Sequence, residues 1–487
     1  MTGAARVHDP HAIDGKFPEP EAHYDVVVVG AGRSGSEAAR AAAAGGGSVL
    51  LVDENPVPGT QIGSDVPLYF GGRATAAVQN AGRMLETVFA NMPWLETAMD
   101  AGAEVLLGTC AWGVYRNGPL VDSLPSQVVA LADGECSWLV GFDRLVLATG
   151  ARDLALAFPG WNQPGVLGAA GFRMLVTRYD AFAGRKLVVV GSHDLGLESA
   201  MLARDKGLDV LAVLETRETP QGDPELIAKI EQAQIPIRCN VHPVSAQGGI
   251  DGVEKLLLSD GTELACDSVV MAVGLVPMIE LADAMHGRCS FVANRGGWVP
   301  EGDPAVTAVG RCAGLADTGF DHAQYRMDWL NALGGACGGE TVICQCEEMT
   351  LADLTGVQPP HYLDRPEALR KRSLASLLAD GPPNPDQVKR LTRIGMGQCQ
   401  GRRCRDQVAM ILAVQSGRSP DEVPLATHRA PVRPLPLSIL ADWQESEAMR
   451  MGWDVWMGIP TQWVPYADIG TPYEEENRRV LGGSKSL

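Results

Sequence analysis

The 487-residue sequence has few aromatic side chains, no long apolar run and a deficit of positive charge. Aromatic residues make up 6% of the chain, whereas 46% of residues are hydrophobic and 56 are glycine. This balance is typical of an α/β protein built from tight strand–turn–helix units, and it argues against a β-sandwich. The length predicts more than one domain, each with ample apolar content for a core.

Several protein classes are excluded by what is missing. No stretch of about eighteen apolar residues is present, so we expect no transmembrane helix. Residues 1–23 lack the apolar centre of a signal peptide and are expected to be a flexible tail. The net charge of −19 argues against binding nucleic acid or anionic membranes, because phosphate contacts need a positive surface. Eleven cysteines suit a reducing compartment, so we expect a cytoplasmic protein.

Four of the cysteines form two close pairs, Cys344/Cys346 and Cys399/Cys404. In an extended segment residues i and i+2 point the same way, so the first pair can converge on one metal centre. The second pair lies in a glycine-rich loop flanked by arginines, whose charge would offset that of a thiolate-bound cluster. The residues alone leave three interpretations open: a 2Fe–2S cluster, a zinc site, for which C-x-C spacing is tight, and unrelated buried cysteines.

A complete dinucleotide-binding unit follows the tail. It consists of a strand, a G-x-G-x-x-G turn, a helix and a second strand ending in acids: residues 24–29, Gly30-Ala31-Gly32-Arg33-Ser34-Gly35, 37–44, 48–52 and Asp53-Glu54. Gly30 permits the tight turn, Gly32 lets the backbone approach a pyrophosphate, and Gly35 allows close helix–strand packing. Asp53 is placed to accept a hydrogen bond from an adenosine ribose, with Glu54 as its substitute.

A second unit of the same topology begins at residue 186. Its turn reads Gly191-Ser192-His193-Asp194-Leu195-Gly196, and its second strand ends at Glu215. His193 replaces the middle glycine where a pyrophosphate would approach, and Asp194 adds like charge there. Either this unit is an NAD(P)H site or it is a degenerate fold kept for architecture, and the steric and electrostatic argument favours the second interpretation.

The strings Cys344-Gln-Cys-Glu-Glu and Lys389-Arg-Leu-Thr-Arg-Ile-Gly-Met-Gly-Gln-Cys-Gln-Gly-Arg-Arg-Cys resemble a known iron–sulfur module. It is the bacterioferritin-associated-ferredoxin-type 2Fe–2S module of the alpha subunits of hetero-oligomeric amino-acid and opine dehydrogenases. That family includes opine oxidases, hydrogen cyanide synthase, D-hydroxyproline dehydrogenase and heterotetrameric sarcosine oxidase. With the dinucleotide motifs, the resemblance covers most of residues 24–435. It implies that Cys344, Cys346, Cys399 and Cys404 are the metal ligands.

The implied fold is an α/β, two-dinucleotide-binding-domain flavoprotein with a C-terminal 2Fe–2S module. Between the cysteine pairs the chain is longer than is usual in the family, and we expect the extra length to be a surface insertion. The parts are a tail at 1–23, a discontinuous FAD/nucleotide-binding domain at 24–155 and 275–338, a degenerate NAD-like domain at 156–274, the 2Fe–2S module at 339–416 with the insertion near 359–385, and an extended Pro/Trp-rich segment at 417–487.

The resemblance also implies further contacts with the nucleotide. Ala148-Thr149-Gly150 resembles the family's second contact with a bound dinucleotide. Two departures concern the flavin: Pro58-Gly59-Thr60-Gln61 has one glycine where relatives have two, and Arg311 follows Gly310 where relatives have aspartate. FAD is therefore one expectation for the first site, and NAD or ATP is the other. The residues predicted to bind the nucleotide are Gly30, Ala31, Gly32, Ser34, Gly35, Asp53, Glu54, Gln61, Ala148, Thr149, Gly150 and Gly310.

No nucleophile–base pair or catalytic carboxylate pair stands out, so we expect no catalytic residue in this chain. The resemblance implies an electron-transfer alpha subunit whose FAD-containing beta subunit oxidises a substrate C–N bond. Further expectations are FMN at the subunit interface and a small third subunit. The electron acceptor is left open. The alternatives are a stand-alone NAD(P)H-dependent FAD/2Fe–2S oxidoreductase and a nucleotide-bound scaffold with a structural or sensing cluster. The tryptophan-rich C-terminal segment either wraps over a partner or packs on its own chain.

Overall fold

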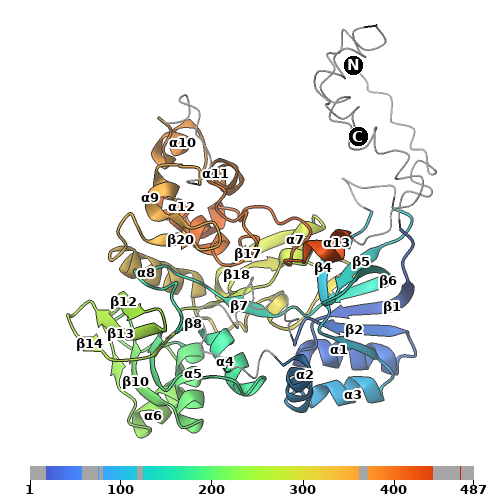
Figure 1. Ribbon diagram of the computed structural model, residues 1–487, viewed down its shortest axis with the longest axis horizontal. Helices are drawn as coiled ribbons and strands as arrows, with labels where there is room; N and C mark the ends of the chain where they lie inside the picture. Colours follow the sequence, from blue (N-terminus) through green and yellow to red (C-terminus); the bar gives the residue numbers. More distant parts are fainter. Residues whose placement is uncertain are drawn as a thin grey trace.

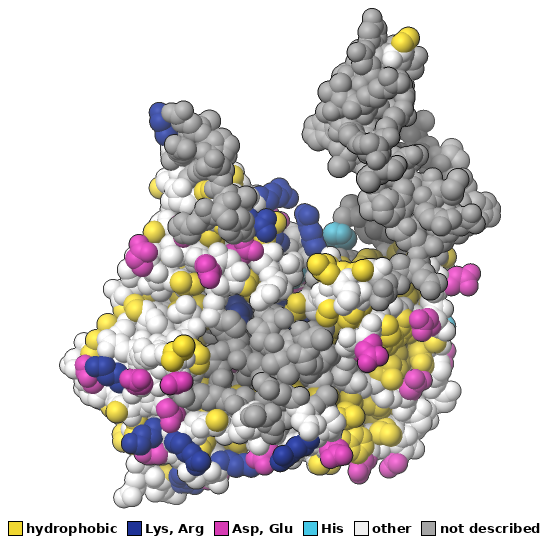
Figure 2. Space-filling model, viewed as in Figure 1, with side chains coloured by type: hydrophobic (Ala, Val, Ile, Leu, Met, Phe, Trp, Pro, Cys, Tyr) yellow, Lys and Arg dark blue, Asp and Glu magenta, His cyan; other side chains and the backbone are white. Residues whose placement is uncertain are grey.

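The computed structural model describes residues 18–56, 75, 80–117, 124–360, 371–441 and 472. Gln61, with the rest of the single-glycine segment, and the tryptophans after residue 441 lie outside the described residues. Within the described ranges, no helix has the length and apolar character needed to cross a bilayer. Figure 2 shows basic and acidic side chains interspersed over the visible face, without a continuous basic surface.

The first nucleotide fold is built on a seven-stranded sheet of order β3-β2-β1-β6-β5-β4, with β19 beside β6. Its central strand β1 pairs in parallel with β2 and β6, and the four valines at its C-terminal end are buried. Helices α1, α2 and α3 lie together on one side of the sheet (Figure 1). The elements are β1 Ala22–Val29, α1 Arg33–Ala44, β2 Val49–Asp53, α2 Ala81–Ala90, α3 Trp94–Asp100, β3 Glu104–Leu107, β4 Cys110–Tyr115, β5 Val128–Ala132, β6 Ser137–Leu147 and β19 Val306–Ala308.

A second sheet of five strands follows, in the order β11-β10-β9-β15-β8, and every one of its strand pairings is parallel. The chain leaves the first fold through β7 and returns through β16, and these two strands pair with each other. β19 then joins the first sheet, as a discontinuous first domain requires. The elements are β7 Ala151–Asp153, β8 Val166–Gly168, α4 Ala169–Thr177, β9 Lys186–Val190, α5 Asp194–Asp205, β10 Asp209–Leu214, α6 Pro224–Gln232, β11 Ile237–Arg238, β12 Pro243–Gly249, β13 Gly252–Leu258, β14 Glu263–Leu264, β15 Ser268–Met271, β16 Leu275–Pro277, α7 Glu280–Ala284, β17 Cys289–Val292 and β18 Gly297–Pro300.

The cysteine-containing part packs against the second fold rather than standing apart. Trp329 of α8, Val188 of β9 and Leu412 of α12 belong to one buried apolar cluster. In Figure 1 this part forms the orange and brown group of helices above α8. Its elements are α8 His322–Gly334, β20 Val342–Cys344, β21 Met349–Thr350, α9 Leu351–Thr355, α10 Leu374–Asp380, α11 Pro385–Thr392, α12 Arg405–Ser416 and α13 Leu437–Ala441.

Helix α10 lies within the predicted surface insertion near 359–385 and packs its apolar side chains inward. Leu374 and Leu377 of that helix are buried in the apolar cluster shared with the cysteines. Ser373 caps the helix, with its side chain accepting from the N–H of Ser376 and the reciprocal bond also present. Residues 361–370 of the predicted insertion lie outside the described part of the chain.

Candidate functional site

The glycine turn between β1 and α1 is shaped by close backbone approaches. A Cβ at Gly30, whose φ is +106°, would lie 2.3 Å from the Ala148 carbonyl oxygen. A Cβ at Gly35 would lie 1.8 Å from the carbonyl oxygen of Gly30. A Cβ at Gly32, in contrast, would have no atom within 4 Å. The turn therefore keeps open the position where the sequence predicts a pyrophosphate.

An open cleft of about 520 Å³ lies beside this turn. Ser34 meets Gly310 at its edge, since a Cβ on Gly310 would lie 2.7 Å from the Ser34 Oγ. Arg311 is exposed, so the cleft carries positive charge where the resemblance leads one to expect aspartate. Sequence reasoning missed Arg295 and Asp317, because only the fold brings them to the turn. The cleft is lined by Ser34, Arg295, Gly310, Arg311, Gly314, Leu315, Ala316 and Asp317.

The two acids at the end of β2 already form hydrogen bonds and an ion pair within the protein. The Asp53 carboxylate is buried and accepts from the Ala31 N–H at 2.7 Å. It also accepts from the backbone N–H and the side-chain amide of Asn55, at 2.9 and 2.8 Å. Glu54 pairs with Arg433 at 2.5 Å, and burial raises the pKa of Glu54. Asp53 thus orders the glycine turn, and any bond to a ribose would use its remaining lone pairs.

The predicted second contact, Ala148-Thr149-Gly150, lies directly against the turn. The Ala148 N–H donates to the Val29 carbonyl oxygen at 2.8 Å. This bond extends the pairing of β1 with β6 by one residue at the C-terminal ends of the two strands. The Thr149 hydroxyl donates to the Met278 carbonyl oxygen at 2.8 Å, where the chain returns to the first fold. Gly150 has φ +78°, which favours glycine. The structure therefore brings both predicted nucleotide segments to one edge of the first sheet.

The four predicted thiols meet in two pairs, but each pair joins distant segments. Cys346 Sγ lies 3.6 Å from Cys399 Sγ, and Cys404 Sγ lies 3.7 Å from Cys344 Sγ. These separations are too long for disulfides, which need about 2.05 Å. Two thiolates on one tetrahedral metal with bonds of about 2.3 Å lie about 3.8 Å apart. Each sulfur pair is thus spaced for one tetrahedral ion.

The expected extended geometry of the first pair is wrong in part. β20 ends at Cys344, and Cys346 lies in the turn that follows. In the described ranges, no three or more His, Cys, Asp or Glu side chains gather in an arrangement suited to a single metal ion. Cys344 also contacts Cys346, so the four sulfurs form one chain of contacts from Cys404 through Cys344 and Cys346 to Cys399.

The backbone of the glycine-rich loop approaches two of the sulfurs closely. The Gly395 N–H donates to Cys344 Sγ at 3.5 Å, and a Cβ at Gly397 would lie 2.5 Å from Cys346 Sγ. Contact with Cys344 and burial raise the pKa of Cys346 to about 11. Free thiols are therefore protonated here, and a bound cation would be needed to hold them as thiolates. Buried, paired thiols beside an inward N–H fit a 2Fe–2S group.

The charged groups next to the thiols are mainly cationic. Arg403 donates to the Gln345 side-chain carbonyl at 3.1 Å, and burial lowers its pKa to about 9, although the Cys399 and Cys346 thiols oppose that shift. Arg393 pairs with Glu347 at 3.2 Å. The predicted arginine environment is present, and its charge would offset that of a thiolate-bound cluster.

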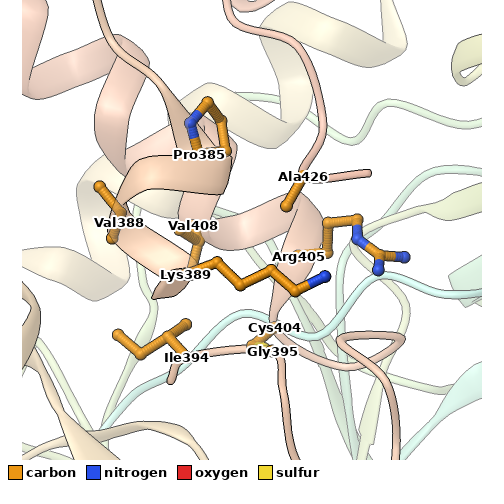
Figure 3. Close-up of a pocket in the computed structure, with 9 residues that line it drawn as sticks. All are labelled: Pro385, Val388, Lys389, Ile394, Gly395, Cys404, Arg405, Val408 and Ala426. Atoms are coloured by element: carbon orange, nitrogen blue, oxygen red, sulfur yellow. The ribbon is translucent and has the colours of Figure 1, made fainter. Parts of the chain in front are cut away.

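A small cavity of about 10 Å³ opens beside Cys404 (Figure 3). The Lys389 side chain extends across it above Gly395 and Cys404, and its ammonium donates to the Thr427 carbonyl oxygen at 3.1 Å. Burial, with Arg405 nearby, lowers the pKa of Lys389. Sequence reasoning assigned no role to Lys389, because only the end of α11 places it beside the thiol. The remaining lining residues are Pro385, Val388, Ile394, Arg405, Val408 and Ala426.

The second dinucleotide turn is filled by the protein's own side chains. The His193 ring packs on Phe320, with ring centroids 4.0 Å apart. The buried Glu215 carboxylate accepts from the Ser192 hydroxyl at 2.5 Å and from the Tyr325 hydroxyl at 2.8 Å. Open space at Gly32 is thus replaced by an aromatic stack in the second fold, which supports the expectation of a degenerate site.

Comparison with known protein families gives two matches. Residues 24–333 match the family described as pyridine nucleotide-disulphide oxidoreductase. Residues 360–443 match the sarcosine oxidase A3 domain. The first match covers more than half of the chain, and the second covers α10 to α13 together with the second pair of cysteines.

Relatives with assigned functions confirm the predicted resemblance to alpha subunits. The alpha subunit of the sarcosine oxidase of Rhizobium meliloti (strain 1021) is 26% identical over 98% of this chain and 49% of its own length. The chain thus spans about half the length of that relative. An opine oxidase subunit of Agrobacterium tumefaciens (strain Ach5) is 26% identical over 86% of this chain and 91% of its own length. The solved L-proline dehydrogenase from P. horikoshii shares the fold, with a TM-score of 0.57, 20% identity and coverage of 87% of this chain and 81% of its own.

Proposed function

This chain belongs to the pyridine nucleotide-disulphide oxidoreductase family, and from that premise we propose that it is an electron-transfer alpha subunit of a hetero-oligomeric dehydrogenase. That it is an oxidoreductase follows from the family and from its alpha-subunit relatives. The proposal goes further: a partner beta subunit with its own FAD oxidises an amine, amino acid or opine, and this chain passes the electrons onward. The proposal also includes an FMN at the subunit interface and a small third subunit.

One observation carries the proposal: the four thiols lie in two pairs of 3.6 and 3.7 Å within the same chain as an open glycine turn. A nucleotide site and four clustered thiols in one chain suit a protein that takes electrons at one place and releases them at another. Relatives named as oxidase subunits over most of this chain point to the same role.

Each group in the chain has an assigned task. Cys344 with Cys404, and Cys346 with Cys399, would hold a 2Fe–2S group, which supplies one-electron oxidation and reduction when bound. Gly395 directs its N–H toward sulfur, and Gly397 leaves room for the Cys346 thiolate. Arg403 supplies compensating charge within the loop.

In the first fold, the turn from Gly30 to Gly35 would receive the pyrophosphate of FAD at the N-terminus of α1. The family match supports FAD there. Arg311 at the cleft supports a nucleotide with more phosphate, ATP, as the alternative, and NAD is the third choice. No side chain of this chain is assigned to substrate oxidation.

The decisive experiment is anaerobic purification of the chain with its native partner. We expect two irons and two acid-labile sulfides per chain, and a paramagnetic signal after dithionite. Serine at any of the four cysteines should abolish that signal, whereas Cys239→Ser, at a scattered cysteine, should retain it. Zinc at these sulfurs, or no signal, would overturn the proposal. Nucleotide released by denaturation and identified by chromatography decides between FAD, ATP and NAD.

The stand-alone NAD(P)H oxidoreductase is disfavoured by the filled second turn at His193 and Phe320. Addition of NADPH or NADH to the isolated chain is expected to leave flavin absorbance unchanged, and rapid bleaching would favour this alternative. The scaffold alternative gains if substrate added to the intact complex fails to reduce the cluster.

A further inference from the structure

Two buried arginines tie the first nucleotide fold to the cysteine loop. Arg152 lies on β7, two residues after Gly150 of the predicted nucleotide contact. Its Nε donates to the Arg402 carbonyl oxygen at 2.7 Å, between the two cysteines of the second pair. Its other two nitrogens pair with Glu280 of α7 at 2.5 Å and with Asp406 of α12 at 2.6 Å. One side chain thus joins three segments.

The second tie runs through the segment that follows α12. The Val432 N–H donates to the Trp112 carbonyl oxygen of β4 at 2.8 Å. The Arg402 side chain donates to the Val432 carbonyl oxygen at 2.8 Å. The next residue, Arg433, pairs with Glu54 at 2.5 Å, directly after Asp53. The cysteine loop is therefore linked by bonded steps to the acids beside the glycine turn.

The guanidinium group of each tie is buried, so breaking its ion pair is costly. Arg152 and Arg433 are each 5% exposed. Glu280, the partner of Arg152, is equally buried, whereas the side chain of Glu54, the partner of Arg433, is 28% exposed. A buried guanidinium that loses its carboxylate leaves two uncompensated charges away from water. The cysteine loop therefore cannot shift without breaking bonds that also hold the nucleotide edge of the first sheet.

We infer that Arg152 and Arg433 are positioning residues that couple the nucleotide site to the thiol site, so that each site binds its group more tightly when the other is filled. Ordering of the Asp53–Glu54 corner by a nucleotide holds Arg433 and Val432, and through them the Arg402 backbone between the thiols. By thermodynamic linkage the reverse effect has the same size. The inference rests on the proposed function, because it takes both sites as binding sites.

The test measures a coupling factor, which is the ratio of the FAD affinities of the chain with and without bound iron and sulfide, in the wild type and in several variants. FAD affinity is determined by fluorescence titration of nucleotide-free chain, with and without reconstituted iron and sulfide, under anaerobic conditions. In the wild type we expect FAD to bind about tenfold more tightly to the iron-loaded chain, within the usual range of about 5–150-fold. Iron release to a chelator should be slowed by FAD by the same factor.

The variants separate coupling from stability. Arg433→Gln and Arg152→Gln should bring the factor below about twofold, and Arg433→Lys should retain part of it. Arg429→Gln is the matched control, since Arg429 is an exposed arginine on the same segment. A merely structural role would weaken both affinities together and leave their ratio unchanged. If Arg152→Gln fails to fold, Arg433→Gln decides, because Arg433 lies outside both sheets.

The outcomes for the inference and for the function are distinct. If the wild-type chain binds both FAD and the iron–sulfur group with a coupling factor near one, the inference is overturned and the proposed function stands. A coupling factor that persists in Arg433→Gln has the same consequence. A chain that takes up neither iron nor FAD overturns the proposed function, and the inference falls with it.

Discussion

At the residue scale, Gly32 and Gly35 lie three positions apart in one turn and control different properties. Gly35→Ala places a methyl group 1.8 Å from a backbone carbonyl, so the turn must open. We expect Gly35→Ala to destabilise the fold by about 2 kcal/mol or more and to abolish nucleotide binding. Gly32→Ala should leave the melting temperature unchanged and weaken nucleotide affinity at least about tenfold, because its methyl group faces the pyrophosphate position.

Calorimetric melting and nucleotide titration of both variants check this separation. Gly334→Ala serves as the control, since a Cβ there meets no atom within 4 Å and no nucleotide role is assigned to it. Equal losses of stability in the Gly32 and Gly35 variants would contradict the assignment of the open position.

Arg403 is the second residue whose replacement should change a measured property, the midpoint potential of the proposed cluster, in a definite direction. It is a half-buried cation beside Cys399 and Cys346, and positive charge favours the reduced, more negative cluster. Arg403→Gln should lower the midpoint potential of the cluster, by about 100 mV for a charge at roughly 6 Å and an effective dielectric constant near 20. A redox titration followed by electron paramagnetic resonance measures the shift. Arg372→Gln, at a partly exposed arginine paired with Asp380, should leave the potential unchanged.

At the scale of elements, side chains at the N-terminus of α8 pack against the second dinucleotide turn. His322 is buried there beside His193 and Phe320, and burial, with Arg326 and His193 nearby, lowers the pKa of His322 to about 4. The unfolded chain binds a proton near pH 6.5, so it binds more protons than the folded chain between these values. The stability contributed by neutral His322 is therefore complete above about pH 6.5 and is lost as the pH falls toward 4.

Chemical denaturation between pH 7 and pH 4 tests this sign. The loss attributable to His322 should be about 1–3 kcal/mol, allowing for partial solvent screening. His322→Gln should flatten the pH dependence in that window, and His286→Gln, at an exposed histidine, should not. A slope that is unchanged in His322→Gln would show that other groups account for the acid sensitivity.

The same elements show how far sequence reasoning reaches. The strand–turn–helix order and the glycine roles were predictable because they follow from backbone sterics within a few residues, as at Gly30 and Gly35. The convergence of four thiols was predictable from the sequence. Which thiol of one segment contacts which thiol of the other was not predictable, since it depends on the turn after β20. Arg433 reaching Glu54 had no local signal, because 379 positions separate the two in the sequence.

At the scale of the whole molecule, the proposed function assigns substrate oxidation to a partner subunit. We expect the chain, produced with its native partner, to purify as a hetero-oligomer whose cluster is reduced by substrate under anaerobic conditions. The chain alone should show no reduction with the same amines, amino acids or opines. Light scattering and electron paramagnetic resonance are the measurements, and reduction in the isolated chain would contradict the division of labour.

The two sulfur–sulfur contacts of 3.6 and 3.7 Å each join residues 344–346 to residues 399–404, so the four-thiol cluster needs both segments of the chain. During synthesis, an emerging chain that has reached only Cys346 contains two of the four ligands that the proposed function assigns to iron. Under the proposed function, the complete centre would form only after Cys404 has also left the ribosome. A product that ends before residue 399 would therefore not hold the complete proposed centre.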